Sequence, residues 1–173
     1  VMGGPEHATD VVRIAREIGG FSIGVAGYPE KHPQAPSLEE DVRRLKEKVD
    51  AGADFVITQL FFDNDVYFEF LTRARKAGIS VPILPGVMPI TRAGQIEKFT
   101  ALSGCAIPDK LVQHLAECGA DESRVQEIGL AYCAAQCADL LRRGAPGLHF
   151  FTLNQSRACH TVYAALHGMG FWG

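Results

Sequence analysis

The sequence lacks a large excess of one charge and lacks any apolar run long enough to span a bilayer. Its 173 residues carry 17 Lys and Arg against 20 Asp and Glu, a formal net charge of −3. No basic stripe marks a nucleic-acid or anionic-membrane surface, and no basic-then-apolar leader opens the chain. With 47% hydrophobic and 21% charged residues, we expect an ordinary globular domain without nucleic-acid or membrane partners.

The sequence also lacks paired cysteines. Its five cysteines include no CxxC pair and stand at positions 105, 118, 133, 137 and 159. Cys133 and Cys137 share a face of an expected helix, and we interpret them as buried small side chains rather than ligands, because nothing completes a zinc site. We therefore expect no metal. An odd count without a disulfide framework indicates a reducing, cytoplasmic setting.

Neither a Ser-His-Asp signature, a phosphate loop nor a GxGxxG motif follows a strand here. Helix and strand patterns alternate instead. Apolar runs predict strands at 21–28, 54–62, 81–88 and 147–153. Periodicity and capping signals predict helices at 6–18, 38–52, 63–77, 92–102, from 108, at 121–143 and at 154–166. This order, one helix and then four βα units, indicates parallel strands with right-handed crossovers.

The second of these helices carries the clearest local signal. Ser37 and Glu40 form a capping-box pattern, in which the serine oxygen accepts a backbone N–H and the glutamate reaches back. Behind it, the apolar positions Leu38, Val42 and Leu45 follow helical spacing. The first helix shows similar spacing, with Val11, Val12, Ile14 and Ile18 as its apolar residues.

Two architectures fit this alternation. The strands are almost continuous apolar runs, which is expected when both faces of a sheet are covered. Four units can form an open doubly wound sheet or half of a (β/α)₈ barrel. A complete barrel needs about 250 residues, so this chain cannot close one alone.

Polar residues stand where the predicted strands end, and the tips of parallel strands face one way. The candidates are Tyr28 and His32 after the first strand and Gln59 after the second. A buried amide at Gln59 needs a partner, which is either a ligand or a neighbouring backbone group. Tyr28 is either a ring that stacks on a ligand or a core aromatic. His32 is either a ligand contact or a surface histidine.

A second pair of candidates lies on the helix that follows. Asp41 and Lys48 are seven residues apart, so they share one side of that helix. This side either faces a ligand or is a solvated face.

Four strings in this order resemble the methylenetetrahydrofolate reductase family. They are VAGYPEKHPQA, EEDVRRLKEKVDAGADFVITQLFFD, PILPGVMPI and GLHFFTLNQ. The resemblance covers nearly the whole chain, which is similar to the C-terminal half of the family's catalytic domain. It implies an α/β fold whose parallel βα repeats form the second half of a (β/α)₈ TIM barrel, as one partial domain over residues 1–173.

The resemblance implies flavin-dependent reduction of 5,10-methylenetetrahydrofolate to 5-methyltetrahydrofolate in one-carbon and methionine metabolism. FAD is then the cofactor, and NADH or NADPH is the electron donor. The positions matching flavin contacts are His7, Ala8, Tyr28, His32, Pro33, Gln34, Ala35, Asp41 and Lys48. His7 departs from the tyrosine usual at its position.

The folate-binding positions implied by the resemblance are Gln59, for the pterin ring, and Phe99, Phe151 and Gln155. The family commonly has tyrosine where Phe151 stands and arginine where Gln155 stands. That arginine would contact the glutamate tail of folate, so its loss affects tail binding. Arg157 is a candidate substitute.

The catalytic acid of the family is expected upstream of Val1, so we assign no catalytic residue here. An alternative function is therefore a catalytically incomplete half-barrel that binds flavin or dimerises without turnover. A third interpretation, an unrelated doubly wound binding protein, leaves the long strings of this resemblance unexplained. Homo-oligomerisation stays open.

Overall fold

The order of helices and strands follows the predicted alternation. The computed structural model describes residues 5, 7–95, 100, 103–154 and 156–172. The helices are α1 (Ala8–Ile18), α2 (Leu38–Asp50), α3 (Asn64–Lys76), α5 (Asp109–Ala116), α6 (Glu122–Arg142) and α7 (Ser156–Gly168). The strands are β1 (Gly24–Gly27), β2 (Phe55–Thr58), β3 (Ile83–Leu84), β4 (Gly86–Val87) and β5 (His149–Phe150). Most of the helix predicted at 92–102 lies outside the described residues.

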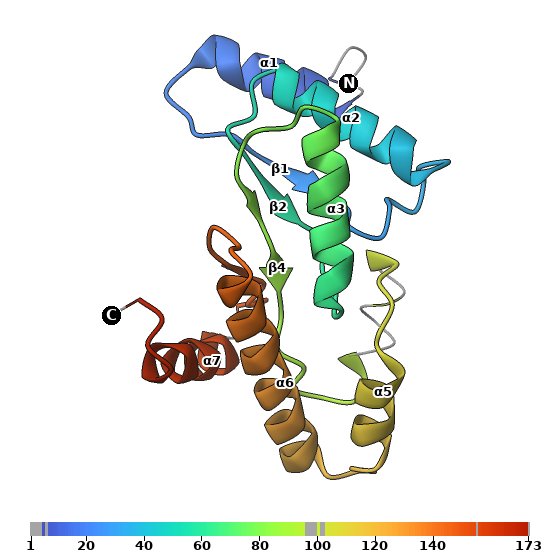
Figure 1. Ribbon diagram of the computed structural model, residues 1–173, viewed down its shortest axis with the longest axis vertical. Coiled ribbons are helices and arrows are strands. Elements are labelled where there is room, and N and C mark those ends of the chain that lie inside the picture. Colours follow the sequence, from blue (N-terminus) through green and yellow to red (C-terminus); the bar gives the residue numbers. More distant parts are fainter. Residues whose placement is uncertain (1–4, 6, 96–99, 101–102, 155, 173) are drawn as a thin grey trace.

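All the described strand pairs are parallel, which confirms the prediction. β1 pairs with β2 from Gly24↔Phe55 to Gly27↔Thr58, and β2 pairs with β3. A second ladder joins β4 to β5. Only Pro85 separates β3 from β4, so one extended segment of chain links the two ladders (Figure 1). The Gly86 N–H also donates to Thr58 Oγ1 at 2.9 Å, which ties β4 to β2.

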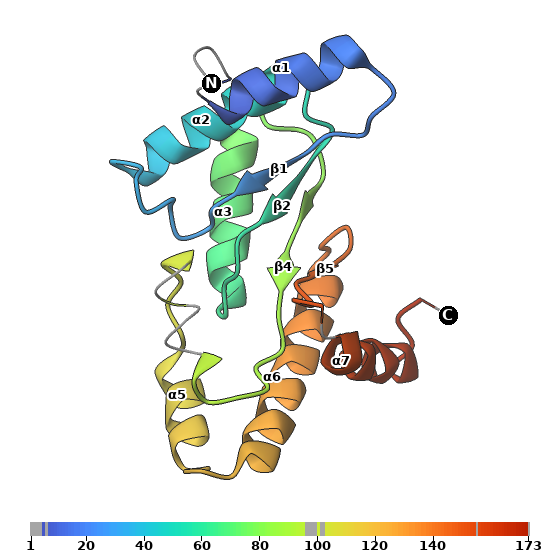
Figure 2. The same ribbon diagram turned by 180° about the vertical axis from the view of Figure 1, so that it is seen from behind.

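The helices cover one face of this sheet. α3 and α6 lie in front of the strands in Figure 1 and behind them in Figure 2. Val56 is fully buried on the covered side, whereas Ile57 is only half-buried and Ala26 is exposed. The expectation that both faces are covered is therefore wrong for the described part of the chain. A doubly wound arrangement, which needs helices on both faces, does not fit these views.

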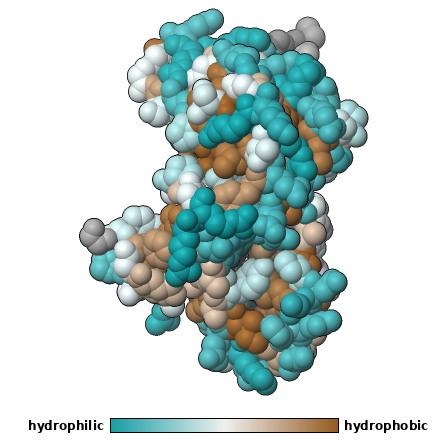
Figure 3. Space-filling view, viewed as in Figure 1, coloured by the Kyte–Doolittle hydropathy of each residue, from teal (hydrophilic) through white to brown (hydrophobic). Residues whose placement is uncertain are grey.

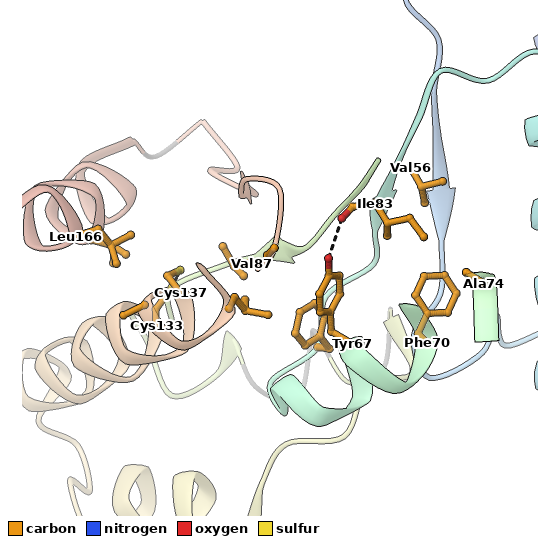
Figure 4. Packing of buried hydrophobic residues seen from close by; sticks show 14 of the residues in the cluster. Val56, Tyr67, Phe70, Ala74, Ile83, Val87, Cys133, Cys137 and Leu166 are labelled. Atoms are coloured by element: carbon orange, nitrogen blue, oxygen red, sulfur yellow. Dashed lines mark hydrogen bonds between the residues drawn. The ribbon is translucent and has the colours of Figure 1, made fainter. Parts of the chain in front are cut away.

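The larger core cluster lies between the covered face and the helices (Figure 4). Tyr67 of α3 is fully buried, and its hydroxyl donates to the carbonyl oxygen of Ile83 in β3 at 2.8 Å. Val87 of β4 and Leu166 of α7 belong to the same cluster. A smaller cluster forms around Met88, α5 and the start of α6. The sheet, α3 and the C-terminal helices therefore share one continuous apolar layer.

Side-chain caps begin α2 and α3, and the cap of α2 is the one that the sequence predicts, with one difference. Ser37 Oγ accepts the Glu40 N–H at 3.1 Å, and Asp63 accepts the Asp65 N–H at 2.9 Å. The predicted return bond from Glu40 is wrong, because its carboxylate accepts from Arg43 and Arg44 instead. Two guanidinium groups on the same helix outcompete the single backbone N–H for this carboxylate.

The apolar stripe of α1 is mostly uncovered. Val12 is buried, but Val11, Ile14 and Ile18 are 52%, 45% and 70% exposed. Phe21, which the sequence assigned to the first strand, lies before β1 and is 56% exposed. The surface view likewise shows hydrophobic areas between hydrophilic ones (Figure 3). The described chain thus leaves apolar surface without an internal partner.

The cysteines are free and buried, as expected for small core side chains. The sulfurs of Cys133 and Cys137 lie 4.0 Å apart on α6. Within the described residues no group of His, Cys, Asp and Glu is arranged to hold a metal ion. No described helix is both long and apolar enough to cross a membrane.

Candidate functional site

The carboxyl ends of β1 and β2 bring Tyr28 and Gln59 to neighbouring positions. Gly27 and Thr58 are register partners, and each candidate is the next residue along its strand. The Gln59 N–H donates to the Gly27 carbonyl at 2.7 Å, which extends the ladder to the tip. Gly27 permits this packing, because a Cβ there would lie 2.8 Å from Val56 and 2.9 Å from Phe70. The two side chains therefore start from adjacent strand ends.

The loop after β1 is fixed by hydrogen bonds to its own residues. The Lys31 N–H donates to the Tyr28 carbonyl at 3.2 Å, and the Ala35 N–H donates to the His32 carbonyl at 2.9 Å. Lys31 takes φ 83° at this turn, and its ammonium donates to the Ala35 carbonyl at 2.6 Å. The loop of residues 28–35 is thus preformed, and we call it the ledge.

Tyr28 and His32 form an aromatic pair on this ledge. Their ring centroids are 4.6 Å apart with planes at 83°. His32 Nδ1 accepts the Gln34 N–H at 3.1 Å, which leaves the proton of a neutral imidazole on Nε2. Burial, and then the negative charge of Asp41, raise the pKa of Tyr28 above its usual value. The phenol therefore remains a hydrogen-bond donor throughout the neutral range.

Asp41 and Lys48 of α2 face this ledge rather than solvent alone. Asp41 Oδ2 accepts the His32 N–H at 2.9 Å. The Lys48 ammonium donates to the Ala26 carbonyl of β1 at 2.6 Å. Burial lowers the pKa of Lys48, and the charge of Asp41 opposes that shift. The side of α2 that carries Asp41 and Lys48 therefore makes polar contacts with the end of β1 and the loop after it.

Gln59 satisfies part of its amide locally. Its Oε1 accepts the N–H of the following residue, Leu60, at 2.9 Å. Within the described residues its Nε2 makes no hydrogen bond, and the side chain is half-buried. The interpretation that Gln59 bonds a neighbouring backbone group is confirmed for its oxygen. The interpretation that Gln59 contacts a ligand stays a prediction, for which the amide nitrogen is the available donor.

A second region of the site is a pocket of about 450 Å³ at the carboxyl ends of β4 and β5. Three segments line it: the stretch after β4, the first turns of α6 and the stretch from Phe151 into α7. The lining residues are Met88, Pro89, Thr91, Arg92, Gln95, Glu122, Ser123, Gln126, Phe151, Thr152, Leu153, Arg157, Ala158 and Cys159. Its size is typical of small-molecule sites.

Gln95 organises one wall of the pocket. Its Oε1 accepts the Thr91 N–H at 2.7 Å and the Arg92 N–H at 3.1 Å. On the opposite segment, the Phe151 ring contacts His149 edge-on, with centroids 4.8 Å apart. The backbone stretch that carries Arg92 is therefore held by a side chain of its own segment.

The structure groups most of the predicted site residues but not all of them. Tyr28, residues 32–35 of the ledge, Asp41 and Lys48 lie together, although Ala35 itself is buried. His7 and Ala8 stand at the exposed start of α1, where the His7 N–H donates to Asp10. Phe99 and Gln155 lie outside the described residues.

Sequence reasoning missed Gln95, Glu122, Ser123 and Gln126 as pocket residues. Their only signal was that polar residues follow the third strand tip and open the helix at 121. Arg157, named as a candidate substitute for an arginine at 155, does line the pocket.

Comparison with known proteins gives one consistent family. A family model described as methylenetetrahydrofolate reductase matches residues 1–167. A probable methylenetetrahydrofolate reductase (NADPH) from Caenorhabditis elegans is 42% identical over 169 residues, which is 96% of this chain and 25% of the relative. The 5,10-methylenetetrahydrofolate reductase of Escherichia coli is 38% identical over 165 residues, covering 92% of this chain and 56% of the relative. The chain thus spans about a quarter and about half of these two proteins.

A solved structure shares the fold. It is an uncharacterised protein from Clostridium thermocellum that binds two copies of 5-methyl-5,6,7,8-tetrahydrofolic acid. The TM-score is 0.60 at 18% identity, and the match covers 94% of this chain and 58% of that chain. At this identity the likeness establishes the arrangement of helices and strands alone.

Proposed function

Because this chain belongs to the methylenetetrahydrofolate reductase family, we propose that it is part of a flavin-dependent enzyme. The reaction is reduction of 5,10-methylenetetrahydrofolate to 5-methyltetrahydrofolate with NADH or NADPH, within one-carbon and methionine metabolism. The observation that carries the proposal is the adjacency of Tyr28 and Gln59 at neighbouring strand ends. Tyr28 and the loop that follows it suit a flavin, and Gln59 suits a pterin.

The proposed architecture is half of a (β/α)₈ barrel, with residues 1–173 as one partial domain. Parallel strands with helices on one face support it, because the uncovered face of such a sheet becomes the barrel interior. Half-buried Ile57 and exposed Ala26 then point into that interior. The strand tips, and with them the candidate site, lie at the end of the barrel where ligands bind.

The ledge after β1 fits FAD in its chemistry. Tyr28 and His32 offer flat rings and N–H or O–H donors, and Lys48 offers a cation close to the end of β1. Asp41 holds the His32 backbone in place. FAD, when bound, carries the hydride between the nicotinamide and the folate. The residues here bind and orient, while the acid of the reaction is expected on polypeptide outside this chain.

Gln59 suits the pterin ring. A carboxamide can present a donor and an acceptor side by side to a pterin edge. Its Nε2 has no partner within the described chain, whereas Oε1 is shared with the Leu60 N–H. We therefore expect the Nε2 amide of Gln59 to donate a hydrogen bond to the pterin ring.

The experiment is a flavin titration of the 173-residue chain, followed by assay of NAD(P)H–menadione turnover and methylenetetrahydrofolate reduction. We expect FAD binding with weak turnover, and full turnover only from a protein that also supplies the rest of the barrel. Gln59→Leu should raise the Kd of 6-methyltetrahydropterin about tenfold, the loss of about one hydrogen bond. A chain that binds neither FAD nor the pterin contradicts the proposal.

A second candidate is a flavin-binding half-barrel that associates without turnover. The exposed stripe of α1 and the uncovered sheet face favour it. Light scattering with a flavin absorbance scan separates the two candidates, since a yellow, inactive oligomer supports only the second.

A further inference from the structure

The segment that joins β2 to α3 is held by two side chains of α6. The Nε2 amide of Gln136 donates to the Phe61 carbonyl at 3.1 Å, and the Tyr132 hydroxyl donates to the Phe62 carbonyl at 2.6 Å. Tyr132 and Gln136 are four residues apart, so they lie on the same face of α6. Two consecutive carbonyls of the segment are therefore fixed by one helix that is distant in sequence.

The start of α3 is bonded to the same stretch of α6. Asn64, the first residue of α3, donates from Nδ2 to the Gln136 carbonyl at 3.0 Å and to Asp139 Oδ2 at 2.7 Å. Donors and acceptors thus come from both partners. A shift of the segment against α6 would break several hydrogen bonds at once.

Gln136 is a polar side chain in a buried place. It is 6% exposed, and Cys137 and Leu140 beside it on α6 are fully buried. Burying a carboxamide costs free energy unless it forms hydrogen bonds, so an apolar side chain would fill this part of the core equally well. The carboxamide adds a donor for the Phe61 carbonyl. Its physical role is therefore to fix the backbone of the segment.

This backbone in turn orients the side chain of Gln59. The Leu60 N–H donates to Gln59 Oε1 at 2.9 Å, so the carboxamide follows the orientation of the Leu60 N–H. Leu60 lies directly before Phe61, whose carbonyl accepts from Gln136. On the other side, the Gln59 N–H donates to the Gly27 carbonyl at 2.7 Å. Gln59 is thus held between two fixed points of the backbone.

We propose that Gln136 and Tyr132 are positioning residues, which orient the Nε2 donor of Gln59 toward the ring of its ligand. The inference rests on the proposed function for the identity of that ligand, a reduced pterin. Both side chains act through the backbone of residues 61 and 62. Loss of either donor loosens the segment and weakens the pterin, while FAD, which the ledge holds, keeps its affinity.

The first test measures the Kd of 6-methyltetrahydropterin and of FAD on the 173-residue chain. We expect Gln136→Met and Tyr132→Phe each to raise the Kd of the pterin about three- to fivefold, which is less than the effect of removing the amide of Gln59 itself. The Kd of FAD should stay unchanged. If FAD weakens as much as the pterin, the effect is a general loss of structure and the inference is overturned.

Gln113→Met and Tyr163→Phe are the matched controls. Both residues are exposed, and neither side chain forms a hydrogen bond within the described part of the chain. The same chemical changes at these positions should therefore leave both Kd values unchanged. Controls that weaken the pterin as much as the α6 variants would overturn the inference.

A double-mutant cycle tests whether the two donors act through Gln59. Gln136→Met and Tyr132→Phe are introduced separately into the Gln59→Leu chain, in which no carboxamide remains to be oriented. We expect neither substitution to change the Kd of the pterin in that background. A weakening of equal size in both backgrounds would mean that the donors act elsewhere, and it overturns the inference.

A further measurement needs no ligand. The side-chain N–H cross-peaks of Gln59 in a nitrogen–proton correlation NMR spectrum are identified by their loss in Gln59→Leu. They should shift in Gln136→Met and in Tyr132→Phe but not in Gln113→Met. If they stay in place in the α6 variants, the inference is overturned. If they shift as expected but the pterin does not bind the parent chain, the positioning of Gln59 stands and the proposed reductase function falls.

Discussion

At the scale of single residues, Asp41 links the parts of the candidate flavin site. Its carboxylate accepts the His32 N–H, and its charge acts on both Tyr28 and Lys48. Asp41→Ala should raise the Kd for FAD about tenfold, because the ledge loses a charge-assisted bond worth about 1.5–3 kcal/mol. Flavin fluorescence titration measures the change.

Asp50→Ala is the control for this prediction. Asp50 is on the same helix but pairs with Lys46 on the exposed face, so its loss should not affect FAD. Equal effects of the two substitutions would mean that Asp41 acts only through helix stability.

At the scale of the elements, Gly86 allows β4 to cross close to β2. A Cβ at this position would overlap the Thr58 carbonyl oxygen and lie 2.5 Å from the Phe151 ring. Gly86→Ala should therefore lower the free energy of unfolding by about 3 kcal/mol through overpacking. Urea denaturation measures this loss.

Gly94→Ala provides the comparison, because a Cβ there meets no atom within 4 Å. We expect this variant to stay within about 0.5 kcal/mol of the parent chain. Similar losses in both variants would show that the crossing of β4 and β2 is looser than described.

Tyr67 of α3 hydrogen-bonds to β3. Its raised pKa makes the stability of the fold depend on alkaline pH. Burial raises its pKa from 10.0 to about 12. Tyrosine in the unfolded chain therefore ionises first, so the stability it contributes is complete below pH 10 and is lost between pH 10 and about 12. Tyr67→Phe should cost about 1–2 kcal/mol at pH 7, since the Ile83 carbonyl loses its donor.

Tyr67→Phe should also reduce the loss of unfolding free energy at alkaline pH. Urea unfolding at pH 7 and at about pH 11, with parent and variant side by side, measures the difference between them. A decline of equal size in both proteins would assign it to the other tyrosines, Tyr28 and Tyr132, whose pKa values burial also raises.

At the scale of the whole molecule, the described chain leaves one sheet face open and the stripe of α1 uncovered. Exposed apolar surface and an unpaired strand edge favour association. We expect the chain to self-associate with rising concentration, and Ile14→Lys with Ile18→Lys to shift it toward monomer. Light scattering over a concentration series gives the result.

Glu17→Lys on the same helix controls for the added charge, since Glu17 is exposed and apolar contact is unchanged. A chain that is monomeric at every concentration, or a double variant that associates like its parent, would contradict the prediction.

The sequence by itself determined the order of the elements and most helix ends. Side-chain caps such as Ser37 and Asp63 act within a few residues, so their positions are readable from local pattern. The residues at the strand tips were also predictable, because parallel strands must end at one edge. The alternation of strands and helices predicts parallel strands, and this is why Tyr28 and Gln59 are close in space.

Only the tertiary structure decided which face of the sheet is covered and where the second pocket lies. Apolar strands look alike whether one face or both are packed, so Ala26 and Ile57 carry no local sign of exposure. Arg92, Glu122 and Arg157 meet because three segments distant in sequence converge at the ends of β4 and β5. Local pattern fixes what forms within a few residues, while long-range packing decides which side chains share a cavity.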